Sequence, residues 1–130
     1  NTDYLSNESI KSHPKLGIHA VNVAPEFGVI ETRTFVRLLE KFNLKDELKL
    51  FENLAIKSNK WKKWLLPNSK ATKREKVLIS GHYIYSSSEF MELKDKVEKF
   101  LLTKSINLDK ELKKSVKKGI MRYVKNLNLI

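Results

Sequence analysis

The sequence predicts an α/β fold in which one buried strand is followed by about six helices. The strand is expected at residues 16–23, where five apolar residues are interrupted only by His19 and Asn22. A short apolar run bounded by Gly and Pro is typical of a strand buried on both faces, and such strands belong to parallel sheets. Its backbone groups need neighbouring strands. Either those strands lie upstream and the chain is a fragment, which we expect, or the domain is all-helical.

Apolar spacing and capping residues place the helices after the strand. Residues 24–28 are expected to form a loop. The expected helical ranges are 29–42, 45–57, a short segment from Trp61 that Pro67 ends, 72–85, 86–103, and a last helix reaching about residue 127. Thr72 with Glu75, and Ser86 with Glu89, form capping-box patterns, and Asn107 or Asp109 begins the last helix.

Composition excludes several classes of protein. The chain of 130 residues is 41% hydrophobic, which is unlike a disordered protein. No apolar run reaches the length that crosses a membrane, and no signal-peptide pattern is present. Without cysteine the sequence has no disulfide, thiolate metal site or cysteine nucleophile. A cytoplasmic location is the default expectation.

The formal charge of +11 raises the question of nucleic-acid binding. Lysines are interleaved with acidic residues in a way that predicts solvated helix faces. The densest cluster, Lys60 to Trp64, mixes cations with aromatic rings as single-strand binders do. However, Trp61 and Trp64 are spaced to share one buried helix face. Core packing is therefore the favoured interpretation, and a basic helical nucleic-acid-binding module is the alternative.

Polar groups around the end of the predicted strand are the candidates for chemistry. Asn22 could bond a substrate hydroxyl or carbonyl, or satisfy a neighbouring strand. Glu26 could cap the following helix, or act as a proton acceptor or metal ligand. The amides of residues 27–30 could hold a phosphate. Arg33 could reach a phosphate or carboxylate, or form a solvent-facing ion pair. His82 either lines a partner's site or packs. The residues contain no complete catalytic constellation.

Three segments suggest a family: HPKLGIHAVNVAPEFGVIETR (13–33), KSNKWKKWLLP (57–67) and TKREKVLISGHYIYSSSEFMELK (72–94). Together they resemble the C-terminal part of tagatose-bisphosphate aldolase non-catalytic-subunit-like proteins, in the class II ketose-bisphosphate aldolase group. The resemblance covers nearly the whole chain and implies the closing part of a (β/α)₈ TIM barrel. Residues 1–15 would be a preceding loop or short helix, 16–57 the last strand and its helices, and 58–130 a helical extension.

The resemblance also implies a site and a function. Asn22 corresponds to an Asn that class II aldolases carry on the final strand, whereas Val23 to Phe27 depart from their acidic-threonine loop. An acid at a barrel mouth suits proton abstraction, so Glu26 would be catalytic. The expected substrate-binding residues are Asn22, Ala24, Phe27, Gly28 and Arg33. The whole protein would be a supporting or ketose-acting aldolase subunit, or a metal-dependent epimerase of ketohexoses, their phosphates or uronates.

The resemblance implies partners as well. A ketose or ketose phosphate is the expected ligand, and a catalytic aldolase subunit and an oligomeric assembly are the expected protein partners. A divalent metal such as zinc would be held by residues outside this segment. Neither a membrane nor a nucleic acid is expected as a partner.

Overall fold

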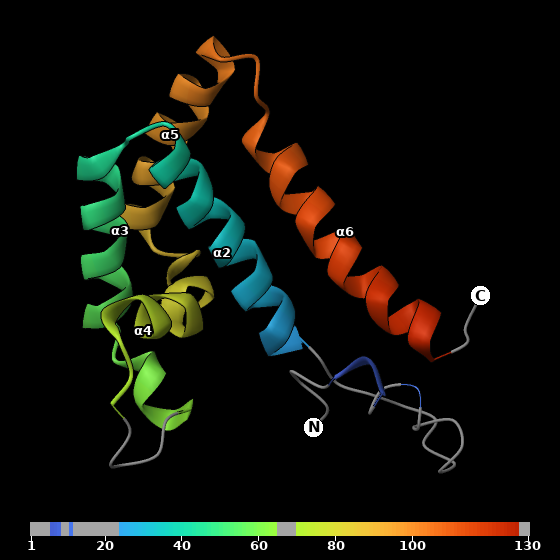
Figure 1. Ribbon diagram of the computed structural model, residues 1–130. Helices are drawn as coiled ribbons and strands as arrows, with labels where there is room; N and C mark the ends of the chain where they lie inside the picture. Colours follow the sequence, from blue (N-terminus) through green and yellow to red (C-terminus); the bar gives the residue numbers. More distant parts are fainter. Residues whose placement is uncertain (1–5, 9–10, 12–23, 65–69, 128–130) are drawn as a thin grey trace.

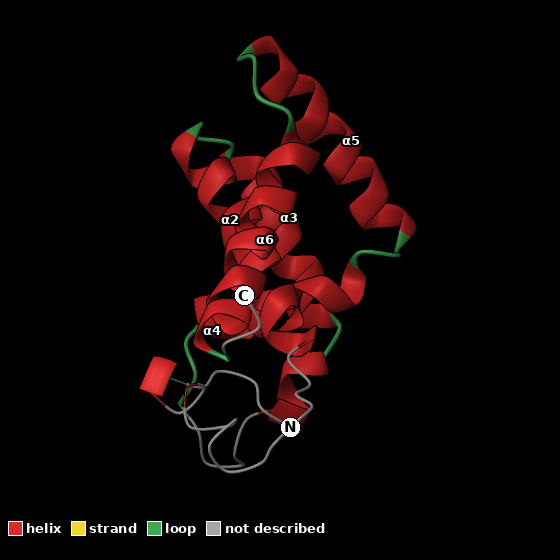
Figure 2. Ribbon diagram, turned by 90° about the vertical axis from the view of Figure 1, so that its right-hand side faces the viewer, coloured by secondary structure: helices red, strands yellow, loops and turns green. Residues whose placement is uncertain are grey.

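The computed structural model describes residues 6–8, 11, 24–64 and 70–127, and most of these residues are helical (Figures 1 and 2). The elements are α2 (Ala24–Lys41), α3 (Lys45–Lys57), the 3₁₀ helix η1 (Lys60–Trp64), α4 (Lys73–Ser80), the 3₁₀ helix η2 (Gly81–Ile84), α5 (Ser88–Thr103) and α6 (Leu108–Asn126). No strand occurs among these residues. The expected α/β class and TIM-barrel fragment are therefore wrong, and the all-helical alternative describes this part of the chain.

The correction is clearest at residues 24–28, which were expected to form a loop and instead form the first turns of α2. Pro25 was interpreted as the end of a strand. Proline is equally suited to the first turn of a helix, because the amide hydrogen that it lacks would have no intrahelical acceptor there. Glu26 in the same turn is favoured by the helix dipole. The expected strand at 16–23 lies outside the described residues.

Side-chain caps fix where three of the other helices begin. The Thr72 hydroxyl accepts a hydrogen bond from the Glu75 amide at 3.1 Å, as the sequence predicted. The Asn107 side chain caps α6, which decides between the two residues, Asn107 and Asp109, that the sequence offered for its start. The cap of α5 is Ser87 and not Ser86. The helix expected at 72–85 is also divided, because α4 ends at Ser80 and continues as η2.

Helix α2 occupies the centre of the arrangement. It contacts α6 along one side and α3, α4 and η2 on others, while α5 packs on α3 and α6 (Figure 1). Helices α2 and α6 run in opposite directions, so the start of α2 lies beside the end of α6 (Figure 1). This pairing brings together two segments from opposite ends of the sequence.

The apolar core lies between α2, α3 and α5. Phe35, Phe51 and Phe90 form a three-ring cluster with centroid distances of 5.1, 5.6 and 5.8 Å. Leu39 and Leu101 are fully buried beside these rings. Burying side chains of this size contributes about 1.5–3 kcal/mol each, so these five residues add strongly to the stability of the fold.

Close approaches at α2 require small residues in its neighbours. A Cβ added at Gly81 would lie 2.4 Å from Thr32 Cγ2. Thr32 is fully buried there; its hydroxyl donates to the Gly28 carbonyl at 2.8 Å, which leaves Tyr85 as the donor in its 2.6 Å bond with Thr32. A Cβ at Gly119 would lie 2.6 Å from Ile30 Cδ1, so α6 also packs tightly on α2.

Candidate functional site

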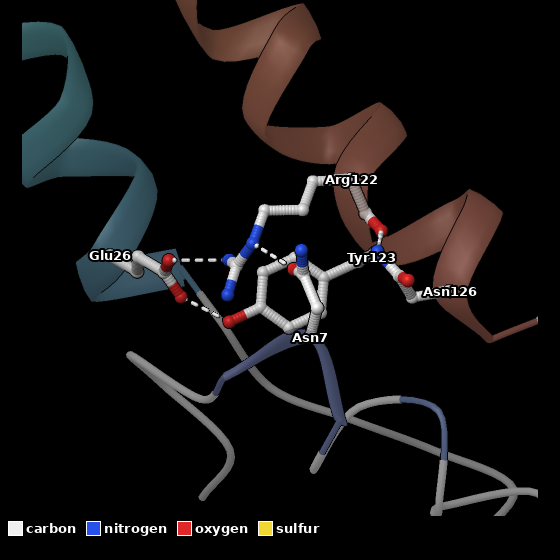
Figure 3. A network of polar contacts seen from close by, with 5 residues as sticks. All are labelled: Asn7, Glu26, Arg122, Tyr123 and Asn126. Atoms are coloured by element: carbon white, nitrogen blue, oxygen red, sulfur yellow. Dashed lines mark hydrogen bonds and ion pairs between the residues drawn. The ribbon is translucent and has the colours of Figure 1, made fainter.

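Glu26 lies at the centre of a polar cluster between the start of α2 and the end of α6 (Figure 3). Arg122 Nη1 donates to Glu26 Oε1 at 3.0 Å, and the Tyr123 hydroxyl donates to Glu26 Oε2. Arg122 Nε also donates to Asn7 Oδ1 at 2.9 Å. Asn126 Nδ2 donates to the Arg122 carbonyl at 2.7 Å. We call these five residues the Glu26 cluster.

Burial makes the cluster unusual for a charged pair. Glu26 is only 8% exposed and Tyr123 only 4%. Burial, together with the hydrogen bond to the Glu26 carboxylate, raises the pKa of the Tyr123 hydroxyl, and Arg122 partly opposes this. The phenol therefore stays protonated and acts as a donor at neutral pH.

Two features of local structure place these side chains. Glu26 lies in the first turn of α2, where the positive end of the helix dipole favours its charge, and the antiparallel packing brings Arg122 of α6 beside it. Phe27 packs edge-to-face on the Tyr123 ring with a centroid distance of 6.0 Å, which orients the phenol. The cluster thus combines a carboxylate, a guanidinium, a phenol and two amides.

The structure brings together only some of the site residues that the sequence predicted. Glu26 and Phe27 belong to the cluster or its wall. Gly28 instead gives room to His82, whose Cγ would lie 2.6 Å from a Cβ at residue 28. Arg33 lies two helical turns beyond Glu26, about 10 Å along the axis.

Two other predicted residues are placed differently. Ala24 is the first residue of α2. Asn22, the residue that carried the aldolase pattern, lies outside the described residues.

Sequence reasoning missed the partners of Glu26. Arg122 and Tyr123 lie 96 and 97 residues further along the chain, and nothing local links them to an acid. One signal was present, because Tyr123 falls in the apolar stripe of the last helix. A tyrosine on a buried face needs an acceptor for its hydroxyl. That requirement predicts a polar partner without identifying it.

His82 packs against α2. Packing was one of the two interpretations that the sequence allowed for this residue. Its ring stacks on Tyr83 with a centroid distance of 4.1 Å. Partial burial is the main cause that lowers the pKa of the imidazole, and the nearby Lys63 ammonium lowers it further. His82 is therefore neutral at pH 7.

Trp61 is held by the protein rather than presented for stacking. Its indole Nε1 donates to the Ile56 carbonyl at 3.2 Å. Lys76 Nζ lies 4.3 Å from the centre of its ring, and Lys62 Nζ lies 5.6 Å away. The ring is half-buried under these cations, which does not suit a platform for nucleic-acid bases.

The described residues contain neither a metal-binding cluster nor a membrane-spanning helix. No group of three or more His, Asp or Glu side chains is placed there to hold a metal ion. Of the helices described, none combines the length and apolar character that crossing a membrane requires.

Comparison with known proteins yields no match to a protein-family model, a curated protein or a solved structure.

Proposed function

We propose that the chain belongs to a ketose-acting protein of the class II tagatose-bisphosphate aldolase group, and that the Glu26 cluster contacts a ketose or ketose phosphate. Two arguments support this function. The three sequence segments that resemble the group together contain 55 of the 130 residues. Glu26, the residue at which the chain departs from the group's pattern, is the residue around which the polar side chains gather. The barrel fold is no part of the proposal.

The buried Glu26 carboxylate is the observation that carries the proposal. A carboxylate that is 8% exposed is costly unless charged or hydrogen-bonding groups surround it. Arg122 and Tyr123 of α6 supply such groups, although they lie 96 and 97 residues further along the chain than Glu26. Carboxylate, guanidinium, phenol and amide groups are those that bind hydroxyl and phosphate groups of sugars. The cluster has the chemistry of a polyol site.

A purely structural role for the cluster is the competing interpretation. The same contacts fasten the end of α6 to the start of α2, and any substitution in them will affect stability as well as binding. The two roles differ in what they predict for a ligand. A structural clamp gives no ketose affinity, whereas a site gives affinity that falls when the polar atoms change.

The test is calorimetric titration of the full chain with D-tagatose, D-fructose and D-tagatose 1,6-bisphosphate. We expect saturable binding of at least one of them and a loss of about tenfold or more in Glu26→Gln, because one charge-assisted hydrogen bond contributes about 1.5–3 kcal/mol. Glu40→Gln is the matched control, since Glu40 is an exposed acid on the same helix paired with Arg74. Melting temperatures measured on the same samples separate unfolding from weakened binding.

Absence of binding by all three sugars would overturn the proposal, and so would equal losses in Glu26→Gln and Glu40→Gln. Product analysis of the whole protein with a divalent metal distinguishes aldol cleavage from epimerisation of a ketohexose, ketose phosphate or uronate. The catalytic-subunit partner, the oligomer, the metal held outside this segment and the cytoplasmic location stay predictions of the resemblance.

A further inference from the structure

The net charge of the chain is concentrated in two segments. Residues 60–76 contain seven basic residues and one acidic residue, and residues 108–130 contain seven basic and two acidic. All other residues together contain twelve basic and twelve acidic residues. The expectation that lysines are interleaved with acids therefore holds for α3 and α5 and fails for α6. From Leu112 to Asn126, α6 has six basic residues and no acid.

Six lysines of α6 form one stripe along the helix. They are Lys110, Lys113, Lys114, Lys117, Lys118 and Lys125, and all are exposed. At 100° per residue they fall within an arc of about 140°, and they extend about 22 Å along the axis. We call this group the lysine stripe. Such a dense row of like charges is unfavourable by itself and gains stability from a counter-charge.

The opposite face of α6 packs against the rest of the protein. Leu112 and Tyr123 are buried, and Gly119 packs on Ile30 of α2. Most of the lysine stripe therefore points away from α2, and only its edge at Lys113 and Lys117 borders a groove with Glu31 of that helix. No ion pair within the described residues joins a lysine of the stripe to an acid, whereas Lys94 of α5 is paired with Asp109 at 2.9 Å.

We propose that the lysine stripe binds the phosphate backbone of a nucleic-acid duplex, independently of its sequence. A duplex carries one phosphate charge per about 1.7 Å of axis, so a contact about 22 Å long meets enough phosphates for all six lysines. The stripe contains no aromatic side chain on which an unpaired base could stack, and this favours a duplex over a single strand.

The alternative of an anionic membrane is disfavoured by the packing of α6. An interfacial helix inserts its apolar face among the lipids. In α6 that face is occupied by contacts with α2. Besides its lysines, the exposed side carries only two large apolar side chains, Met121 at 41% exposure and Ile120 at 40%. A membrane would have to attract the stripe by charge alone.

The proposal is tested by fluorescence anisotropy of a labelled 20-base-pair duplex with the full chain, in 50–200 mM salt. We expect the logarithm of the binding constant to fall with the logarithm of salt concentration with a slope of about −5, as for six phosphate contacts. The triple variant Lys114→Gln, Lys117→Gln and Lys118→Gln should reduce the slope to about −3 and weaken binding about tenfold or more at 50 mM salt.

The matched control is the triple variant Lys45→Gln, Lys49→Gln and Lys57→Gln on α3. It removes the same charge from exposed lysines, but from a helix in which acids balance them. We expect its affinity to stay within about twofold of the parent chain with an unchanged slope. Circular dichroism should give the same helix content for both variants.

Equal weakening of duplex binding in the two triple variants would overturn the proposal, because it would show that binding depends only on the net charge of the chain. So would tighter binding to a single-stranded 20-mer, or binding to phosphatidylserine vesicles without binding to the duplex. Ketose titration of the α6 variant separates this proposal from the previous one, since the stripe and the Glu26 cluster lie on different faces of α6.

Discussion

The two ends of α2 are held by different physics. Near its end, Phe35 and Leu39 are buried among the rings of the apolar core. At its start, Glu26 is also buried, at 8% exposure, but is held by Arg122 and Tyr123. The apolar end tolerates many arrangements of similar volume, whereas the polar end requires particular atoms in particular places. One end therefore supplies stability, and the other supplies a specific pairing of α2 with α6.

The largest effect is expected at the apolar end. Leu39→Ala should lower the free energy of unfolding by about 2–5 kcal/mol, because it removes buried methyl groups and leaves a cavity at a fully buried position. Urea denaturation followed by circular dichroism measures the change. The same substitution at Leu50, which is 47% exposed, is the matched control and should cost less than about 1 kcal/mol. Comparable losses at both positions would contradict the location of the core.

The polar end should give a smaller, pairwise effect. A double-mutant cycle with Glu26→Gln and Arg122→Met should show a coupling energy of about 1–3 kcal/mol, because the carboxylate is nearly enclosed and loses a charged partner. The parallel cycle on Glu40 and Arg74, whose side chains are 45% and 49% exposed, should show about 0–1 kcal/mol despite its shorter distance of 2.8 Å. Equal coupling in the two cycles would mean that burial does not distinguish the pairs.

The difference between the two ends also explains what the sequence could predict. Apolar spacing correctly placed α3 and most of α2, α5 and α6, since burying a helix face depends on a period that is visible locally. Thr72 was predicted as a cap, and Asn107 as one of two candidates, because a cap bonds an amide only three residues away. These signals are contained in short windows of sequence.

The wrong or missing predictions concern signals that are ambiguous within a short window of sequence, or that such a window does not contain. Pro25 and Gly28 indicate a loop after a strand as readily as the first turns of a helix, and the sheet was expected because the apolar run before them was interpreted as a buried strand. The partners of Glu26 depend on how α6 folds back on α2, which no local pattern encodes. The lysine stripe was visible in the sequence, but it was averaged with the balanced charges of α3 and α5.

Glu31 is a third position on α2, between its two ends, and its contribution to stability is expected to depend on pH. Glu31 lies at a cavity of about 190 Å³ together with Lys94 of α5. It also borders a groove with Asp109, Lys113 and Lys117 of α6. Desolvation raises the pKa of the Glu31 carboxyl, Lys94 opposes the shift, and Asp109 adds to it. Glu31 is thus a carboxylate whose charge is only partly compensated.

The smallest effect is expected for Glu31→Gln. An acid with a raised folded-state pKa holds its proton more tightly in the folded state, so the folded protein loses stability as the pH rises from the unfolded-state pKa through the folded-state one. Removing the charge should therefore stabilise the protein at pH 7, by a few tenths of a kcal/mol because the group is half-exposed, and the gain should vanish near pH 3. Urea denaturation at both pH values measures it, with the exposed Glu92→Gln as the control for the loss of one negative charge. A gain that is equal at pH 3 and pH 7, or that appears equally in the control, would show that desolvation does not govern this carboxyl.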